Sequence, residues 1–199
     1  MMLVEQTTVP LEALPVEEFK DHLRLGRAFA DSGVQDGVLE TYLRSALAAI
    51  EGRTGKVLLE RTFAWTLSGW RELGRQALPV APVTSITGVK LIDRHGDETV
   101  IAPEKYRLLP DAQRPRLVST ALHLPLIPTN GQAEVTFVAG FGPAWDDVPA
   151  DLGQAVFLLA AHYHENRSAV LAGEVAMPFG VSLLIDRYRT VRLFGEGGR

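Results

Sequence analysis

The sequence predicts an α+β protein in which a helical framework carries one inserted antiparallel β unit. Apolar residues recur at helical spacing over residues 14–55 and again over 149–167, whereas short alternating runs fill residues 56–142. The chain has 199 residues, 46% of them hydrophobic, which is enough for a substantial core. We therefore expect a single domain, 1–199, made of two N-terminal helices, the β unit, one long helix near the C-terminus and a C-terminal segment.

Two helices are predicted before residue 56. Pro15 followed by two glutamates is typical of a helix start, and this helix should end near Gly26. Asp36 is the expected N-cap of the second helix, which should end at Gly52 or Gly55. The apolar residues of the second helix keep the 3.6-residue period closely: Val38, Leu39, Tyr42, Leu43, Ala46, Leu47 and Ile50.

Alternating apolar residues predict the strands of the β unit. The first strand is expected over 57–67, and shorter ones near 106–109, 116–119 and 133–139. Residues 84–102 predict a hairpin whose turn lies between Asp93 and Asp97. Gly96 should adopt a positive φ in that turn.

The long C-terminal helix should begin at Pro149 and bury a stripe formed by Leu152, Val156, Leu159 and Tyr163. Residues 155–161 are apolar through nearly two turns, so Phe157 and Leu158 fall outside this stripe. Such a helix either lies centrally in its own fold or packs against a neighbouring chain, and the sequence leaves both interpretations open. We name Phe157 and Leu158 as candidate subunit–subunit contacts.

Composition excludes several classes of protein. The chain has no cysteine, which excludes disulfides and thiolate chemistry and fits folding in a reducing cytoplasm. Its formal charge of −4 argues against a free-standing nucleic-acid-binding protein, because such proteins carry a basic surplus. The N-terminus lacks the pattern of a signal peptide, and no apolar run approaches the roughly 20 residues of a membrane span. We expect a soluble protein without a membrane partner.

The stretch HYHENR, 162–167, is the strongest candidate for chemistry. His162 and His164 are two positions apart, so on a helix they point about 160° away from each other and cannot hold one metal ion together. No nucleophile elbow and no phosphate-binding loop occurs, and AGFG (139–142) lacks the spacing of a dinucleotide-binding motif. We therefore expect no enzyme, no catalytic or metal-binding residue and no cofactor.

Two alternative functions remain open at this stage. One is a small metal-dependent enzyme that uses His162 or His164 together with Glu165. The other is a nucleic-acid-binding module that uses the C-terminal arginines.

Several stretches with compatible spacing, between about Leu14 and Phe194, carry a family resemblance. In chain order they are VEEFKDHLRL, VLETYLRSALAAIEGRTGKVL, LPVAPVTSITGVKLIDRHGDE, YRLLPD, VTFVAGFGPAWDDVPADLGQAVFLLAAHYHENR and MPFGVSLLIDRYRTVRLF. The most diagnostic feature is the AGFG link, followed by VP, into a helix that ends HYHENR. Taken together, the chain resembles the head–tail connector (adaptor) proteins of tailed bacteriophages and of gene transfer agents.

The resemblance implies a structural, non-enzymatic role. It implies a ring of twelve copies in the neck of a virion or virus-like particle, made in the bacterial cytoplasm. The partners it implies are the portal protein and a tail-side neck protein, either a stopper or a tail terminator. DNA would pass through the ring without specific binding, and the net negative charge suits such a conduit because it adds no affinity for phosphates.

In similar adaptors the C-terminal segment reaches onto the portal, and the matching segment here is 181–194. Tyrosine and arginine are common at the energetic centres of protein interfaces. The resemblance therefore predicts that a chain without 181–199 folds but cannot join the particle, although a helix packed on its own subunit remains the alternative. The expected portal-docking residues are Leu183, Leu184, Arg187, Tyr188, Arg189, Arg192, Leu193 and Phe194.

Overall fold

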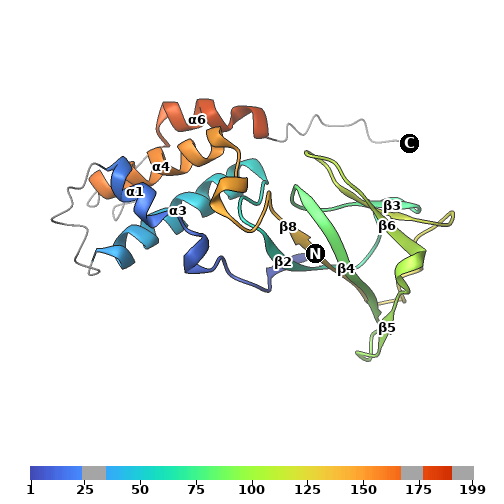
Figure 1. The fold of residues 1–199 in the computed structure, drawn as a ribbon. Coiled ribbons are helices and arrows are strands. Elements are labelled where there is room, and N and C mark those ends of the chain that lie inside the picture. The colour runs from blue at the N-terminus through green and yellow to red at the C-terminus, as the bar shows by residue number, and fades with distance from the viewer. Residues whose placement is uncertain (24–34, 167–176, 190–199) are drawn as a thin grey trace. The chain divides into compact units, whose positions relative to one another are not determined.

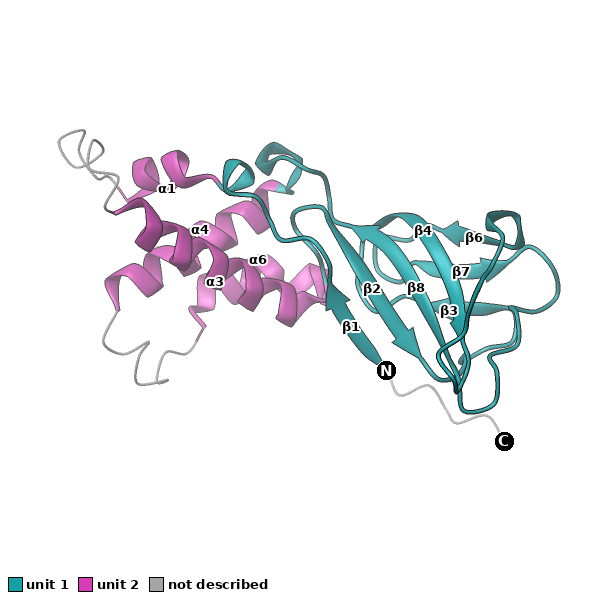
Figure 2. Ribbon diagram, turned by 90° about the horizontal axis from the view of Figure 1, so that it is seen from below, with its two compact units in different colours: residues 1–14, 56–149 teal, residues 15–55, 150–199 magenta. Residues whose placement is uncertain are grey.

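The computed structural model describes residues 1–23, 35–166 and 177–189. The chain divides into two compact units (Figure 2). The β unit comprises Met1–Leu14 and Lys56–Pro149, and the helical unit comprises Pro15–Gly55 and Ala150–Arg199. Each unit is therefore built from two stretches of chain that are distant in sequence.

The helical unit is a bundle in which α1 and α4 pack on α3, and α6 packs on α4 (Figure 1). Its helices are α1 Val16–His22, α3 Asp36–Thr54, α4 Ala150–Glu165 and α6 Phe179–Ile185, the last followed by the short 3-10 helix η4 Asp186–Tyr188. Among the described residues, the most deeply buried side chains come from each of these α-helices: Phe19, Leu39, Leu43, Ala46, Ile50, Leu152, Ala155, Val156, Leu159, Ala160, Val181 and Ile185.

The second predicted helix is confirmed, but its expected N-cap is wrong. Gln35 occupies the N-cap position, and Asp36 is the first helical residue. The Asp36 carboxylate instead lies 2.8 Å from the ammonium of Lys20, a buried lysine that needs an anionic partner. The helix ends as predicted at Gly55, whose φ of 69° is left-handed and whose N–H donates to the carbonyl of Glu51.

Two other expected boundaries also shift. The first helix ends at His22 instead of near Gly26, and Pro15 is its N-cap. A helix over 181–194 was the alternative to a docking segment, but α6 ends at Ile185 and Arg189 is already extended. Residues 190–194 of that expectation lie outside the described residues.

The β unit consists of two antiparallel sheets (Figures 1 and 2). The larger sheet has the order β1-β2-β8-β4-β5, with β1 Met2–Glu5, β2 Arg61–Leu67, β8 Gln132–Ala139, β4 Val83–Ile92 and β5 Glu98–Val100. The smaller sheet has the order β3-β7-β6, with β3 Arg75–Ala77, β7 Arg116–Ser119 and β6 Tyr106–Leu109.

One apolar core lies between the two sheets. Trp65 and Val135 of the larger sheet are buried, as are Tyr106 and Leu117 of the smaller one. The inward side chains of β2, β8 and β4 follow the strand period of two. Strands 106–109 and 116–119 have the predicted bounds, and the hairpin turn is confirmed by Gly96 with a φ of 92°.

The first strand of the β unit begins later than predicted. Residues 57–60 were expected to be part of it, but β2 starts at Arg61. Val57 and Leu59 are nevertheless buried, because this stretch makes isolated bridges from Lys56 to Ala81 and from Leu59 to Gly142. Burial of an apolar residue is thus not evidence that it belongs to a strand. Strand β1 was not predicted.

The AGFG link makes a close backbone crossing. Gly140 has a φ of 143°, and a Cβ at this position would overlap the backbone of Leu59 and Glu60. Its N–H donates to the carbonyl of Pro82, and the N–H of Phe141 donates to that of Leu58. The glycine is therefore needed for the turn of the backbone between β8 and α4. Within the described residues, no helix is long and apolar enough to cross a membrane.

Candidate docking surface

Helix α6 has apolar side chains on two opposite faces. Val181 and Ile185 are fully buried, and the helix packs on α4 through this inner face. Phe179 and Leu183 are also four residues apart, but they are offset from the inner pair by two positions and are 81% and 66% exposed. A seven-residue helix is too short to be stable alone, so its position depends on the inner face.

A single carboxylate fixes the chain just after α6. Asp151, in the first turn of α4, accepts a hydrogen bond of 2.7 Å from the Tyr188 hydroxyl. The guanidinium of Arg187 lies 2.7 Å from the other carboxylate oxygen and also donates to the Tyr188 hydroxyl. Arg187 additionally stacks over the Tyr188 ring at 4.7 Å. The cluster ties η4 to the beginning of α4.

The pKa values of both Tyr188 and Arg187 are raised within this cluster. Burial raises the pKa of the Tyr188 phenol, and the bond from that hydroxyl to Asp151 raises it further. The pKa of Arg187 is also raised, first by its hydrogen bond to Tyr188 and then by the charge of Asp151. Tyr188 therefore remains a neutral hydroxyl that donates to Asp151 throughout the physiological range.

The structure separates the expected docking residues into three groups. Leu183 is exposed and available to a partner, and Leu184 is half-buried. Arg187 and Tyr188 bind Asp151 of the same subunit, and Arg189 pairs with Asp186 at 3.0 Å. Arg192, Leu193 and Phe194 lie outside the described residues.

Sequence reasoning missed Phe179. The expected segment began at Val181, two residues too late, because the helix start at Pro178 was not recognised. The available signal was Pro178 directly before Phe179, which is typical of a helix start, together with Leu183 four residues further on the same helix face. Phe179 and Leu183 together form what we call the outer α6 face.

Phe157 finds a partner within its own subunit. Its ring stacks on that of Phe19 at 5.9 Å and lies 5.5 Å from that of His22, which places α1 against this side of α4. Phe157 and Leu158 are both half-buried. Helix α1 therefore covers part of the Phe157 side chain. Contact of the exposed parts of Phe157 and Leu158 with a neighbouring subunit stays a prediction.

Residues 162–166 of the HYHENR stretch form the packed and capped end of α4, and Arg167 lies outside the described residues. The side-chain amide of Asn166 donates to the carbonyl of His162 at 3.0 Å and lies 3.1 Å from its ring nitrogen. The ring of His164 meets the edge of Tyr42 at 5.9 Å, and Glu165 is exposed. Among the described residues, no group of three or more histidines and acids is placed to hold a metal ion.

Comparison with solved structures gives closely similar chains. Relative to a chain from the neck of an empty gene transfer agent (GTA) particle with C6 symmetry, identity is 54%, each chain is covered over 98%, and the TM-score is 0.89. A chain from the neck of a native GTA particle with C12 symmetry gives 50% identity, 98% coverage of each chain and a TM-score of 0.85. A chain from the virion of a native GTA particle gives 54% identity, 98% coverage of each chain and a TM-score of 0.87.

No protein-family model matches the chain, and no curated protein matches it.

Proposed function

Because this chain belongs to the head–tail connector family of gene transfer agent particles, we propose that it forms a ring of twelve copies in the particle neck. In this proposal the whole chain, 1–199, acts as one connector domain. The ring joins the portal to a tail-side neck protein, a stopper or a tail terminator, and DNA passes through it without specific binding. The role is structural and non-enzymatic.

The outer α6 face is the observation that supports portal docking. Two large apolar side chains, Phe179 and Leu183, stand exposed on a helix whose opposite side is fixed in the core. Covering a side chain of this size contributes about 1.5–3 kcal/mol, and a ring repeats the contact in every copy. Rigid presentation also lowers the ordering cost of binding. We assign the portal to this face, with Leu184 beside it.

The arginines of the segment support the same assignment in a different way. Arg187 and Arg189 keep intramolecular acidic partners, but their side chains remain 69% and 52% exposed. They can therefore form the polar rim of an interface whose apolar centre is the outer α6 face. Arg192, Leu193 and Phe194 continue the proposed segment.

A double substitution tests the docking role. Phe179→Ser with Leu183→Ser should fold normally, because both side chains are exposed, but its incorporation into particles should fall at least tenfold. The measurement is quantitative immunoblotting of purified particles, with circular dichroism as the folding check. Leu11→Ser is the matched control, since Leu11 is also 52% exposed but lies in the short 3-10 helix Leu11–Ala13 of the β unit and belongs neither to α6 nor to the surfaces proposed below to join the subunits.

Normal incorporation of the folded double variant would exclude this face as the portal contact. Deletion of 181–199 is a poor test, contrary to the expectation from the sequence. It would remove Val181 and Ile185 from the helical core, so loss of folding would accompany any loss of docking.

A further inference from the structure

The smaller sheet of the β unit has a basic outer surface. Cross-strand register places Arg75, Val118 and Arg107 in one row across β3, β7 and β6. The next row contains Arg116 between Ala77 and Leu109. The pKa of nearby Glu72 is lowered, first by its hydrogen bond from Arg75 and also by the charges of Arg116 and Arg114.

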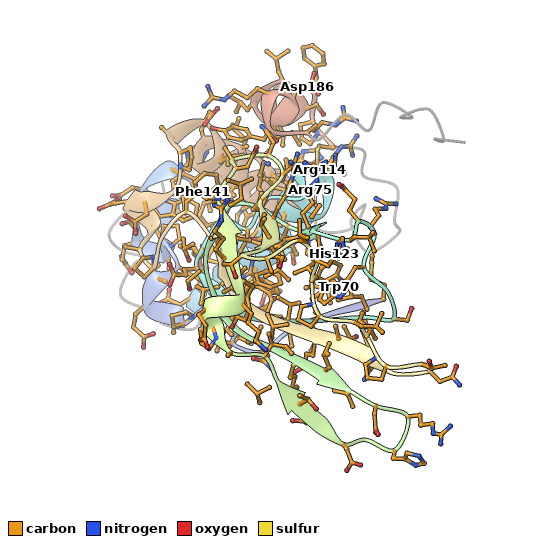
Figure 3. All side chains as sticks on the ribbon, turned by 90° about the vertical axis from the view of Figure 1, so that its right-hand side faces the viewer. Trp70, Arg75, Arg114, His123, Phe141 and Asp186 are labelled. Carbon is orange, nitrogen blue, oxygen red and sulfur yellow. The ribbon has the colours of Figure 1, made fainter. Side chains whose placement is uncertain are left out.

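Two loops add exposed leucines beside this sheet. Leu73, Leu122 and Leu126 are 73%, 85% and 89% exposed. The loops that carry them are held together, because the N–H of Leu124 donates to the carbonyl of Leu73 at 2.7 Å. The indole of Trp70 likewise donates to the carbonyl of Pro125 at 2.7 Å; Trp70, Arg75 and His123 mark the two loops and the start of β3 (Figure 3).

Three leucines held in such exposure have no role in the core of the β unit. Because their loops adjoin β3 and β7, we group them with the arginines of the smaller sheet as the leucine–arginine face: Leu73, Arg75, Arg107, Arg116, Leu122 and Leu126. Apolar anchors surrounded by arginines are typical of a protein-binding surface.

The larger sheet presents a different outer surface. One row crosses all five strands through Met2, Thr66, Glu134, Lys90 and Val100. The opposite side of the same strands carries the core residues, so this row points outward.

The outer surface of the larger sheet is acidic and carries exposed apolar side chains, so it complements the leucine–arginine face. Lys90 is shared between Glu98 at 2.8 Å and Glu134 at 3.1 Å, which leaves one carboxylate charge in excess. Met2 and Val100 are 59% and 75% exposed at the two edges of the sheet. We call this surface, with Val4, the sheet face: Met2, Val4, Glu98, Val100 and Glu134.

We propose that the leucine–arginine face of one copy packs against the sheet face of the next copy around the ring. This inference rests on the proposed function. The two sheets enclose one core, so the two faces point away from each other within one β unit. A cyclic ring needs such an arrangement, because each subunit must present two different surfaces that fit each other head to tail.

The relatives support a second copy as the occupant, because they come from neck assemblies with C6 and C12 symmetry. The charges support the same choice. Attraction between the basic face of one copy and the acidic face of the next favours contact between unlike faces over contact between like faces.

The absence of cysteine in the chain allows a direct test. A variant with Leu122→Cys and Val100→Cys carries one thiol on each face. Assembled particles containing this variant are treated with a short bismaleimide and analysed by denaturing electrophoresis. We expect a ladder of covalent multimers, because every copy is linked to the next.

Two controls fix the geometry. Each single-cysteine variant should stay monomeric on the gel, since unlike faces meet. The variant with Leu73→Cys and Leu122→Cys, which places both thiols on one face, should also give no ladder.

Particles that contain the chain but give no ladder with the double variant would overturn the inference and leave the neck assignment intact. Dimers from a single-cysteine variant would also overturn it, because they show that like faces meet. Absence of the unmodified chain from purified particle necks would instead contradict the proposed function itself.

Discussion

At the level of single residues, Asp151 attaches the segment after α6 to the beginning of α4. It receives the Tyr188 hydroxyl and the Arg187 guanidinium, and it also accepts the N–H of Leu152 at the start of its own helix. A carboxylate in the first turn is favoured there by the helix dipole. The same side chain therefore stabilises α4 locally and fixes η4, a segment distant in sequence.

Replacement of Asp151 should loosen η4 without unfolding the bundle. Asp151→Ala removes hydrogen bonds worth about 1–2 kcal/mol together, which corresponds to a 5- to 30-fold rise in local opening. Trypsin cleavage after Arg187 and Arg189 should accelerate by that factor, as measured by mass spectrometry. Asp151→Asn should give a smaller increase, because its amide oxygen still accepts from Tyr188.

Asp186→Ala is the control for this prediction, since it removes only the exposed pair with Arg189. Its effect on cleavage after Arg187 should be slight. Equal cleavage rates for the wild type and Asp151→Ala would mean that the cluster does not hold the segment.

At the level of elements, the link between β8 and α4 depends on Gly140. The chain leaves the sheet there with a left-handed φ and crosses the backbone of residues 59 and 60 too closely for any side chain. Backbone atoms cannot move away as a side chain could, so the crossing excludes every residue except glycine.

Gly140→Ala should destabilise the β unit by about 2–4 kcal/mol, because it adds both a positive-φ penalty and a steric overlap. Urea denaturation followed by tryptophan fluorescence measures the loss. Gly52→Ala is the matched substitution in a helix with open space around it, and it should instead stabilise the helical unit, as followed by circular dichroism, by about 0.5–1 kcal/mol. A neutral Gly140→Ala would contradict the close crossing.

Some elements could be predicted from sequence because their signals are local. Gly55 and Gly96 end a helix and make a turn through their own backbone freedom. Asp36 was misjudged because its true partner, Lys20, lies on another helix. The predicted strand wrongly included residues 57–60, because residues in isolated bridges are as apolar as strand residues. Strand β1 was not predicted because all four of its side chains are exposed and show no alternation.

The candidate docking surface could be predicted only in outline. Leu183 was named because its segment resembles the docking segment of a known family; the structure exposes its side chain, and its contact with a portal stays a prediction. The attachment of Arg187 and Tyr188 to Asp151 could not be predicted, since α4 and η4 meet only in the folded bundle. The leucine–arginine face could not be predicted either, because two separate loops and three strands contribute to it.

At the level of the whole molecule, the two units have separate cores and can be followed separately. All three tryptophans, Trp65, Trp70 and Trp145, belong to the β unit. Helical circular dichroism arises from the other unit. Fluorescence and circular dichroism therefore report on different parts of one chain.

Lys20→Met should lower the stability seen by circular dichroism by about 2 kcal/mol and leave the fluorescence transition in place. The pKa of Lys20 is raised from 10.5, first by its bond to Asp36 and then by that to Glu17. This stabilisation is therefore complete below pH 10.5 and is lost as the pH rises through the pKa of the folded state. Denaturation at a series of pH values should show the two proteins converging only in alkali. Equal shifts in both signals would contradict separate cores.

Under the proposed portal docking, the burial of Val181 and Ile185 links folding of the helical unit to entry into the particle. An interrupted translation product that stops before Phe179 lacks Val181 and Ile185 of the bundle interior as well as the helix that carries Phe179 and Leu183. Such a product cannot display the proposed portal contact and is an unstable substrate for proteases. Under the proposed docking role, unfinished copies would therefore be degraded before they enter the assembly.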